Sequence, residues 1–191
     1  MVDLARARGK ILSFCDETVF SSNQIKFKAW YPTKAPRYEI EKERLGFKAV
    51  AVVAAHSKDG KMQAIVTHDT AISTPQFIEF LQKLRETEPQ SKWIYLFVDN
   101  LSVHHARQVK SFAESIKIEL IYNGNHSSEY MPIERAWAWS KQLFTKRCIS
   151  EAQFENQDAM KDLVVDCIKK TPVEMLRKRT ATCLRMMKNF L

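Results

Sequence analysis

The stretch Trp93-Ile94-Tyr95-Leu96-Phe97-Val98-Asp99-Asn100 carries most weight in assigning the fold of this chain. Its first six residues are apolar, which is typical of a strand buried on both faces of a sheet. The run stops at Asp99, and a helix is predicted shortly afterwards over residues 105–115. In an open α/β sheet, ligands bind beyond the ends of such strands. Asp99 is therefore the first candidate for a functional residue.

The rest of the chain predicts an α/β protein with a mixed sheet. Further strands are expected at residues 10–15, 24–30, 47–55, 62–68 and 117–122, and the turn at 57–60 predicts a hairpin. Helices are expected at about 74–88, with Thr74 as the cap, and at 133–147, 154–169 and 172–189. This order is that of the ribonuclease H-like fold, with a mixed five-stranded sheet flanked by helices and extra helices at the C-terminus.

Composition predicts one domain of ordinary size over residues 1–191. We expect a core at about 10–147 and basic C-terminal helices at about 151–191. Hydrophobic residues make up 45% of the chain, and no run of eighteen apolar residues could cross a membrane. The four cysteines form no closely spaced pair, so no zinc site is expected, and they are typical of reduced thiols in an intracellular protein.

The net charge of +8 favours a polyanionic partner. Basic residues gather in the last helix, where Arg177, Lys178 and Arg179 are candidates for contacts to DNA phosphates, although a solvated helix face is nearly as plausible. We expect this helix to pack on the core through four apolar residues: Val173, Leu176, Leu184 and Met187.

Three acids lie where chemistry is expected. Asp16 follows the strand at 10–15, Asp99 follows the strand at 93–98, and Glu134 begins the helix at 133–147. Singly, such acids are more often turn residues, helix caps or complements to a helix dipole. Carboxylates that meet without a basic partner repel each other unless a cation lies between them. Oxygen ligands of this kind suit Mg²⁺ or Mn²⁺, and two such ions support phosphodiester cleavage.

The sequence motifs around these acids match a known pattern. Phe14-Cys15-Asp16-Glu17 follows the first strand, and Asp99-Asn100 is followed by His104 in the pattern Asp-Asn-x-x-x-His. The third motif is Ser127-Ser128-Glu129-Tyr130-Met131-Pro132-Ile133-Glu134, and 34 residues separate Asp99 from Glu134. Together they resemble the catalytic (DDE-type) domain of the Tc/mariner transposases and their bacterial insertion-sequence relatives. Ser128, Tyr130 and Met131 depart from the family's proline, leucine and asparagine.

The resemblance implies a DNA transposase that cleaves DNA and transfers the freed 3′ hydroxyl in cut-and-paste integration. It implies Asp16, Asp99 and Glu134 as catalytic residues holding two Mg²⁺ or Mn²⁺ ions, with Asn100 and His104 beside them or on the substrate. His104 could equally act near the scissile phosphate or bond the backbone. The implied partners are double-stranded transposon ends and target DNA, with a homodimer on paired ends. The expected location is the nucleus in a eukaryote, or the cytoplasm and nucleoid in a bacterium.

Two alternatives remain open, namely another ribonuclease H-like nuclease and a catalytically silent, domesticated DNA-binding or interaction protein. Members of the family carry helix-turn-helix modules before the catalytic core, and none is expected within this chain. Glu17 should point to the opposite face of its strand from Asp16, so both cannot easily bind one ion. Trp137 is expected in the core. Finally, the strand at 10–15 should lie directly beside the strand at 93–98, because only that adjacency brings Asp16 to Asp99.

Overall fold

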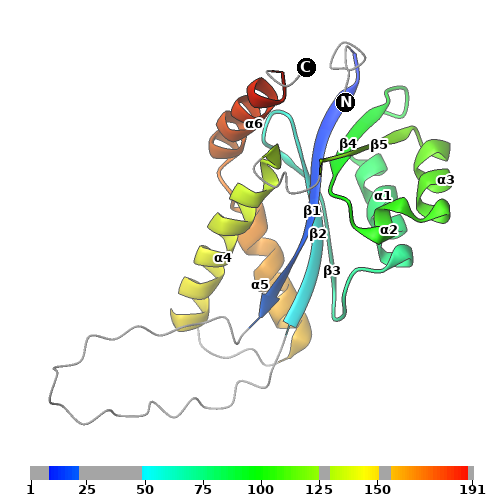
Figure 1. The fold of residues 1–191 in the computed structure, drawn as a ribbon. Coiled ribbons are helices and arrows are strands. Elements are labelled where there is room, and N and C mark those ends of the chain that lie inside the picture. The colour runs from blue at the N-terminus through cyan, green and yellow to red at the C-terminus, as the bar shows by residue number, and fades with distance from the viewer. Residues whose placement is uncertain (1–8, 22–48, 125–129, 151–155, 189–191) are drawn as a thin grey trace, which may run out of the picture.

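The computed structural model describes residues 9–21, 49–124, 130–150 and 156–188, and the predicted strand at 24–30 lies outside them. A five-stranded sheet stands between two layers of helices (Figure 1). Its strands are β1 (Ile11–Ser21), β2 (Ala49–Ser57), β3 (Met62–His68), β4 (Ile94–Val98) and β5 (Ile118–Tyr122). The helices are α1 (Thr74–Glu86), α2 (Ser102–His105), α3 (Arg107–Ser115), α4 (Ile133–Ser150), α5 (Gln157–Lys169) and α6 (Val173–Lys188).

The strand order is β3-β2-β1-β4-β5, with β1 antiparallel to β2 and parallel to β4. The predicted adjacency of the first strand and the strand ending at Val98 is therefore confirmed. Phe14 on β1 pairs with Phe97 on β4. Continued by two residues, this register brings position 16 level with position 99, so Asp16 and Asp99 come from neighbouring strands.

Strand β1 is longer than predicted. The sequence suggested an end at Cys15, but antiparallel pairing with β2 continues as far as Ser21, opposite Ala49. The parallel partner β4 stops at Val98. Asp16 consequently lies inside β1 rather than after it, yet at the level where the neighbouring strand ends.

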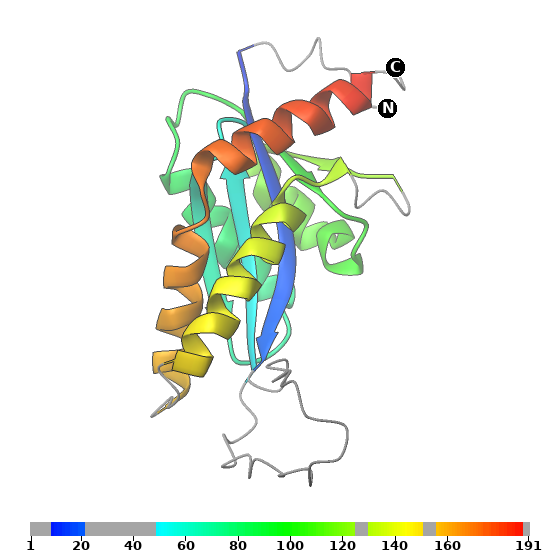
Figure 2. The same ribbon diagram turned by 90° about the vertical axis from the view of Figure 1, so that its left-hand side faces the viewer.

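Each face of the sheet carries its own apolar core. Helices α4, α5 and α6 cover one face, as Figure 2 shows from that side, and α1, α2 and α3 cover the other. Because side chains alternate along a strand, Phe14 and Phe20 enter the core beneath α4, whereas Cys15 enters the core beneath α1. Asp16 thus points to the α4 side and Glu17 to the side of α1 and α2. All four cysteines are buried and unbridged, as expected.

Two helix starts differ from the sequence expectation. Helix α1 has Ser73 rather than Thr74 as its cap, because the backbone N–H of Ser73 bonds the Gln76 side chain at 3.1 Å. The helix predicted at 105–115 is two helices, since Ala106 adopts an extended ψ of 134° that interrupts the helical path. His104 therefore belongs to the short helix α2, directly after β4.

Helix α6 packs on the core through a narrower stripe than predicted. Leu176 is fully buried and Leu184 packs against the same core, while the side chain of Met187 lies outside the described residues. Val173 is 46% exposed, so its predicted core role is wrong. Val173 is the first residue of α6, and its backbone carbonyl, rather than its side chain, lies against Gly60 in the β2–β3 turn. In the described part of the chain, every helix is too short or too polar to span a bilayer.

Candidate active site

Asp16 lies at the centre of the sheet and is held from α4. The indole Nε1 of Trp137 donates a hydrogen bond to Oδ2 of Asp16 at 2.9 Å. Trp137 is 3% exposed, which confirms its predicted place in the core. Its apolar periodicity gave no sign of this second role. The bond fixes one carboxylate oxygen of Asp16 on the α4 side of the sheet.

The surroundings of Asp16 are unfavourable for its negative charge. Burial and the neighbouring charges of Glu17 and Glu134 raise its pKa, and the hydrogen bond from Trp137 opposes them, with the result that the pKa of Asp16 is about 7. A carboxylate that is buried near other carboxylates is stabilised by a cation. The electrostatics of Asp16 therefore fit a metal ligand.

Glu134 reaches the same region from the first turn of α4. Its side chain is exposed, and its backbone N–H bonds the carbonyl of Met131 at 3.3 Å. Two turns later on the helix, the half-buried Lys141 interacts electrostatically with Glu134 and Asp16. Burial lowers the pKa of Lys141, and the charges of the two acids oppose that shift. Helix α4 thus directs an acid, an indole and a lysine towards Asp16. The indole bond was not predicted.

Asp99 follows the last residue of β4, and one of its carboxylate oxygens is already bonded. Oδ1 accepts the backbone N–H of Leu101 at 3.1 Å and lies 3.0 Å from Nδ1 of His104. Burial by itself would raise the pKa of Asp99, but the bonds from His104 and Leu101 outweigh it and the pKa is lowered. Asp99 is therefore ionised in an environment that stabilises its charge.

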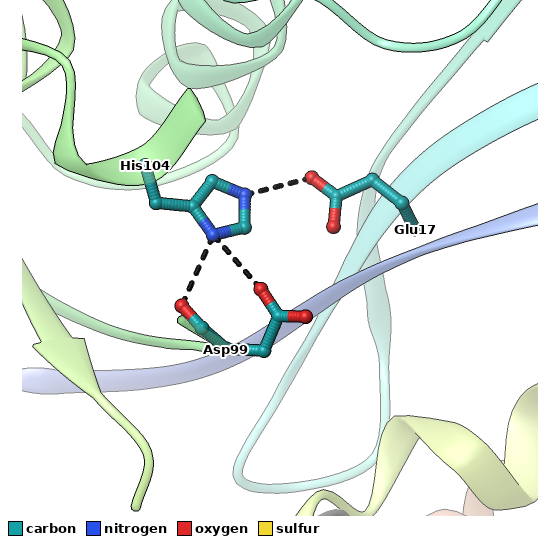
Figure 3. A group of neighbouring side chains, drawn as sticks. All are labelled: Glu17, Asp99 and His104. Atoms are coloured by element: carbon teal, nitrogen blue, oxygen red, sulfur yellow. Dashed lines mark hydrogen bonds and ion pairs between the residues drawn. The ribbon is translucent and has the colours of Figure 1, made fainter. Parts of the chain in front are cut away.

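His104 joins Asp99 to Glu17 (Figure 3). Its side chain is 1% exposed, with Nδ1 also 3.2 Å from the backbone carbonyl of Asp99 and Nε2 2.9 Å from Oε1 of Glu17. Burial would lower the pKa of the ring, but the bonds to Asp99 and Glu17 raise it to about 10. The ring is therefore an imidazolium between two carboxylates. The backbone contact expected for His104 is present, and a role near the phosphate stays a prediction.

The acids of the site fall into two groups. Glu17, Asp99 and His104 offer atoms within 4.8 Å of one another that could hold a metal ion. Their charges are already compensated, however, because the imidazolium lies between the two acids. Asp16 and Glu134 interact unfavourably on the α4 side. Their hard oxygen donors and their mutual repulsion, which the single charge of Lys141 opposes, fit Mg²⁺ or Mn²⁺ better. That Asp16, Asp99 and Glu134 bind the same ions stays a prediction.

Asn100 bridges to the end of β5. Its side-chain amide donates to the carbonyl of Asn123 at 2.5 Å, and its Oδ1 lies 3.3 Å from Nε2 of His105. These contacts tie the segment after β4 to the neighbouring strand. A role of Asn100 in orienting Asp99 or binding substrate stays a prediction.

The basic residues of α6 lie mostly on the surface. Arg177 and Lys178 are exposed and pair with Glu174 at 2.7 and 3.6 Å. Arg179 is half-buried, and so is less exposed than a fully solvent-facing residue. The reason is helical geometry: Arg179 stands one turn after the buried Leu176 and borders the same stripe. Their contact with DNA stays a prediction.

Comparisons with known proteins agree with this arrangement. A family model described as DDE superfamily endonuclease matches residues 11–161. The insertion element IS630 uncharacterized 39 kDa protein of Shigella sonnei is 33% identical over 85 residues, which cover 44% of this chain and 24% of that protein. The Mos1 transposase paired-end complex with the left transposon end is similar in fold, with a TM-score of 0.71, 12% identity and coverage of 94% of this chain and 55% of that chain.

The Mos1 transposase catalytic domain, in a structure with Raltegravir and Mg, has a TM-score of 0.61 and 14% identity, and the match covers 96% of this chain and 88% of that chain. The chain therefore belongs to the DDE superfamily of endonucleases. The likeness to Mos1 confirms the ribonuclease H-like fold, and the IS630 and Mos1 proteins are similar proteins of the kind that the Tc/mariner resemblance of the sequence motifs predicted. The chain spans about a quarter of the curated relative and just over half of the full Mos1 chain.

The structure places two of the three residues of the third motif that depart from the family pattern. Ser128 lies outside the described residues, and Tyr130 is half-buried. Met131 is 3% exposed and belongs to the core beneath α4. A methionine in place of the family's asparagine therefore adds apolar packing just before the helix that carries Glu134.

Proposed function

We propose that this domain cleaves DNA and transfers the freed 3′ hydroxyl to target DNA, with Asp16, Asp99 and Glu134 as the catalytic acids and two Mg²⁺ or Mn²⁺ ions. The observation that carries the proposal is the in-register parallel pairing of β1 with β4, which makes Asp16 and Asp99 neighbours. The charge of Glu134 acts on Asp16 from α4. Three carboxylates brought together by β1, the end of β4 and α4 supply the oxygen donors that such a cation binds.

The protein's own groups would have distinct tasks in this reaction. Trp137 fixes one oxygen of Asp16, and the N–H groups of Leu101 and His104 fix one oxygen of Asp99. Asp16 must lose its proton when a cation binds, so binding should release a proton near pH 7. When bound, divalent ions would activate the attacking oxygen and stabilise the leaving oxygen.

The proposed partners are double-stranded DNA ends and target DNA, with a homodimer acting on paired ends. The Mos1 structure is a paired-end complex with a transposon end, which supports this proposal by likeness of fold. The net charge of +8 and the exposed Arg177 and Lys178 are suited to phosphate contacts. We propose the nucleus as the place of action in a eukaryote, and the cytoplasm or nucleoid in a bacterium.

Nicking of supercoiled plasmid by the purified chain in Mn²⁺ or Mg²⁺ tests the proposal. Asp16→Asn, Asp99→Asn and Glu134→Gln should each abolish nicking, whereas Asp158→Asn, at an exposed acid on α5, should retain it. Nicking that survives all three active-site changes would refute the assignment. DNA binding with no nicking by the wild-type chain would favour a catalytically silent protein instead.

A further inference from the structure

Glu17, His104 and Asp99 form a continuous hydrogen-bonded chain across three elements. Glu17 comes from the face of β1 opposite Asp16, His104 from α2, and Asp99 from the end of β4 (Figure 3). Both ring nitrogens face oxygen acceptors, with Nε2 2.9 Å from Glu17 and Nδ1 3.0 Å from the Asp99 carboxylate. Both nitrogens must therefore carry hydrogen, and the ring acts as a double donor.

Both the ring and the backbone of His104 are held by neighbouring residues. The ring centroid of Phe77 on α1 lies 4.4 Å away. The backbone N–H of His104 bonds the carbonyl of Leu101 at 3.0 Å, and its carbonyl accepts the hydroxyl of Tyr122 at 2.8 Å. A side chain locked in this way keeps its donors in fixed directions.

Asp99, in contrast, has little to fix it by itself. It lies beyond the last residue of β4, and its side chain is 39% exposed. The bonds from Leu101 and His104 both end on Oδ1. They set the rotation of the carboxylate, and Oδ2 becomes the oxygen available to a cation.

We propose that Glu17 and His104 are a positioning pair that fixes Asp99 for metal binding, without either residue binding the ion. This inference rests on the proposed function, in which Asp99 is a metal ligand. The adjacent acids Asp16 and Glu17 then divide the work between the two faces of β1. Asp16 faces the ion, and Glu17 holds the histidine that holds Asp99. Loss of a group that orients a metal ligand typically costs about 10- to 100-fold in metal affinity.

Two variants of His104 separate its two hydrogen bonds. The amide of Asn can replace the donor at Nδ1, which bonds Asp99, and the amide of Gln can replace the donor at Nε2, which bonds Glu17. Mn²⁺ affinity of the whole chain is measured by isothermal titration calorimetry. His104→Gln should weaken Mn²⁺ binding about 10- to 100-fold relative to wild type. His104→Asn, which keeps the donor to Asp99, should bind Mn²⁺ with an affinity close to that of wild type. Glu17→Gln, which keeps an acceptor oxygen, should weaken binding less than His104→Gln.

Controls make the outcomes distinct. His68→Asn, on the edge strand β3, alters another His–Glu pair, in which Nε2 of His68 lies 3.4 Å from Glu79 of α1, and should leave Mn²⁺ affinity unchanged. Thermal unfolding of each variant reports whether it is folded, and the comparison of Asn with Gln uses only folded variants. If one of the two does not fold, the Mn²⁺ affinity of Glu17→Gln and the pulsed electron paramagnetic resonance spectrum of bound Mn²⁺ decide whether His104 positions Asp99.

Three results would overturn the inference or its basis. Equal losses in His104→Asn and His104→Gln, or no loss in either, would exclude positioning through Nδ1. Coupling of a ¹⁴N nucleus to bound Mn²⁺ in pulsed electron paramagnetic resonance, lost in His104→Gln, would make His104 a ligand of the ion. Unchanged Mn²⁺ affinity in Asp99→Asn would refute the proposed function itself, whichever result the His104 variants give.

Discussion

Replacement of Asp16 by Asn should stabilise the metal-free protein at neutral pH. Asn keeps the size of the side chain and an oxygen that accepts the indole N–H of Trp137. It removes a negative charge that is buried and repelled by Glu17 and Glu134. A residue needed for catalysis is thus expected to weaken the fold when no cation is present.

The size of the effect follows from the pKa of Asp16, which burial and the nearby acids raise from 3.8 to about 7. This difference is worth about 4 kcal/mol, because each pKa unit corresponds to about 1.4 kcal/mol. The folded state holds the proton in a pH range where the unfolded state has lost it. The stabilising contribution of Asp16 is therefore complete below about pH 4 and lost as pH rises through about 7.

The assay is urea unfolding in EDTA at several pH values. The variant lacks this titration, so its advantage in free energy of unfolding over wild type should grow from about 2 kcal/mol at pH 5 to about 4 kcal/mol at pH 8, as upper values. Asp99→Asn is the matched control of opposite sign. The pKa of Asp99 is lowered, because the bonds from His104 and Leu101 outweigh its burial, so that variant should be less stable than wild type at pH 7. An Asp16→Asn protein that is equally or less stable at pH 8 would refute the reasoning.

Three further predictions concern the same site and its support. Trp137→Phe removes the hydrogen bond that lowers the pKa of Asp16, so Mn²⁺ titrations should show proton competition extending to higher pH; an unchanged pH profile would contradict this. Gly60→Ala should lower the free energy of unfolding by about 2 kcal/mol or more in urea, because φ is +83° and the new Cβ would lie 2.3 Å from the carbonyl oxygen of Val173. Gly9→Ala, with φ +80° and nothing within 4 Å, should cost only about 1 kcal/mol, and equal losses would exclude a clash with α6. Mn²⁺ at 100 times its Kd should stabilise wild type by about 3 kcal/mol in thermal or urea unfolding but not Asp16→Asn; equal gains would place the ion elsewhere.

Much of the fold could be predicted from local pattern. Strand β3 begins and ends at the predicted residues, and β4 and β5 each begin one residue later than predicted. Apolar runs bounded by turn residues carry this information within a few positions. The placement of β1 beside β4 was also predicted, because two acids that meet in one site must come from neighbouring strands.

What could not be predicted depends on partners distant in sequence. The length of β1 is set by β2, which pairs with it as far as Ser21. Thr18, Val19 and Phe20 favour a strand, but the two acids before them interrupt the apolar run and suggest an earlier end. The bond between Trp137 and Asp16 joins residues 121 positions apart. A tryptophan in an apolar helical stripe is sufficiently explained by packing, so its N–H gives no separate signal.

The alternation of side chains along β1 correctly predicted that Asp16 and Glu17 point to opposite faces of the sheet, but it predicted no role for Glu17. That task depends on His104, which α2 brings within 2.9 Å of the acid from 87 residues away. The break at Ala106 keeps α2 to a single short turn after Asp99, so His104 faces back towards the strand ends. The two acids of the sequence word Asp16-Glu17 therefore have opposite electrostatic surroundings. Glu17 meets a cationic ring, whereas the charge of Asp16 is unfavourable until a divalent ion binds. A strand that placed both acids on one face would lose this contrast, and with it the separation of a metal ligand from the group that positions its neighbour.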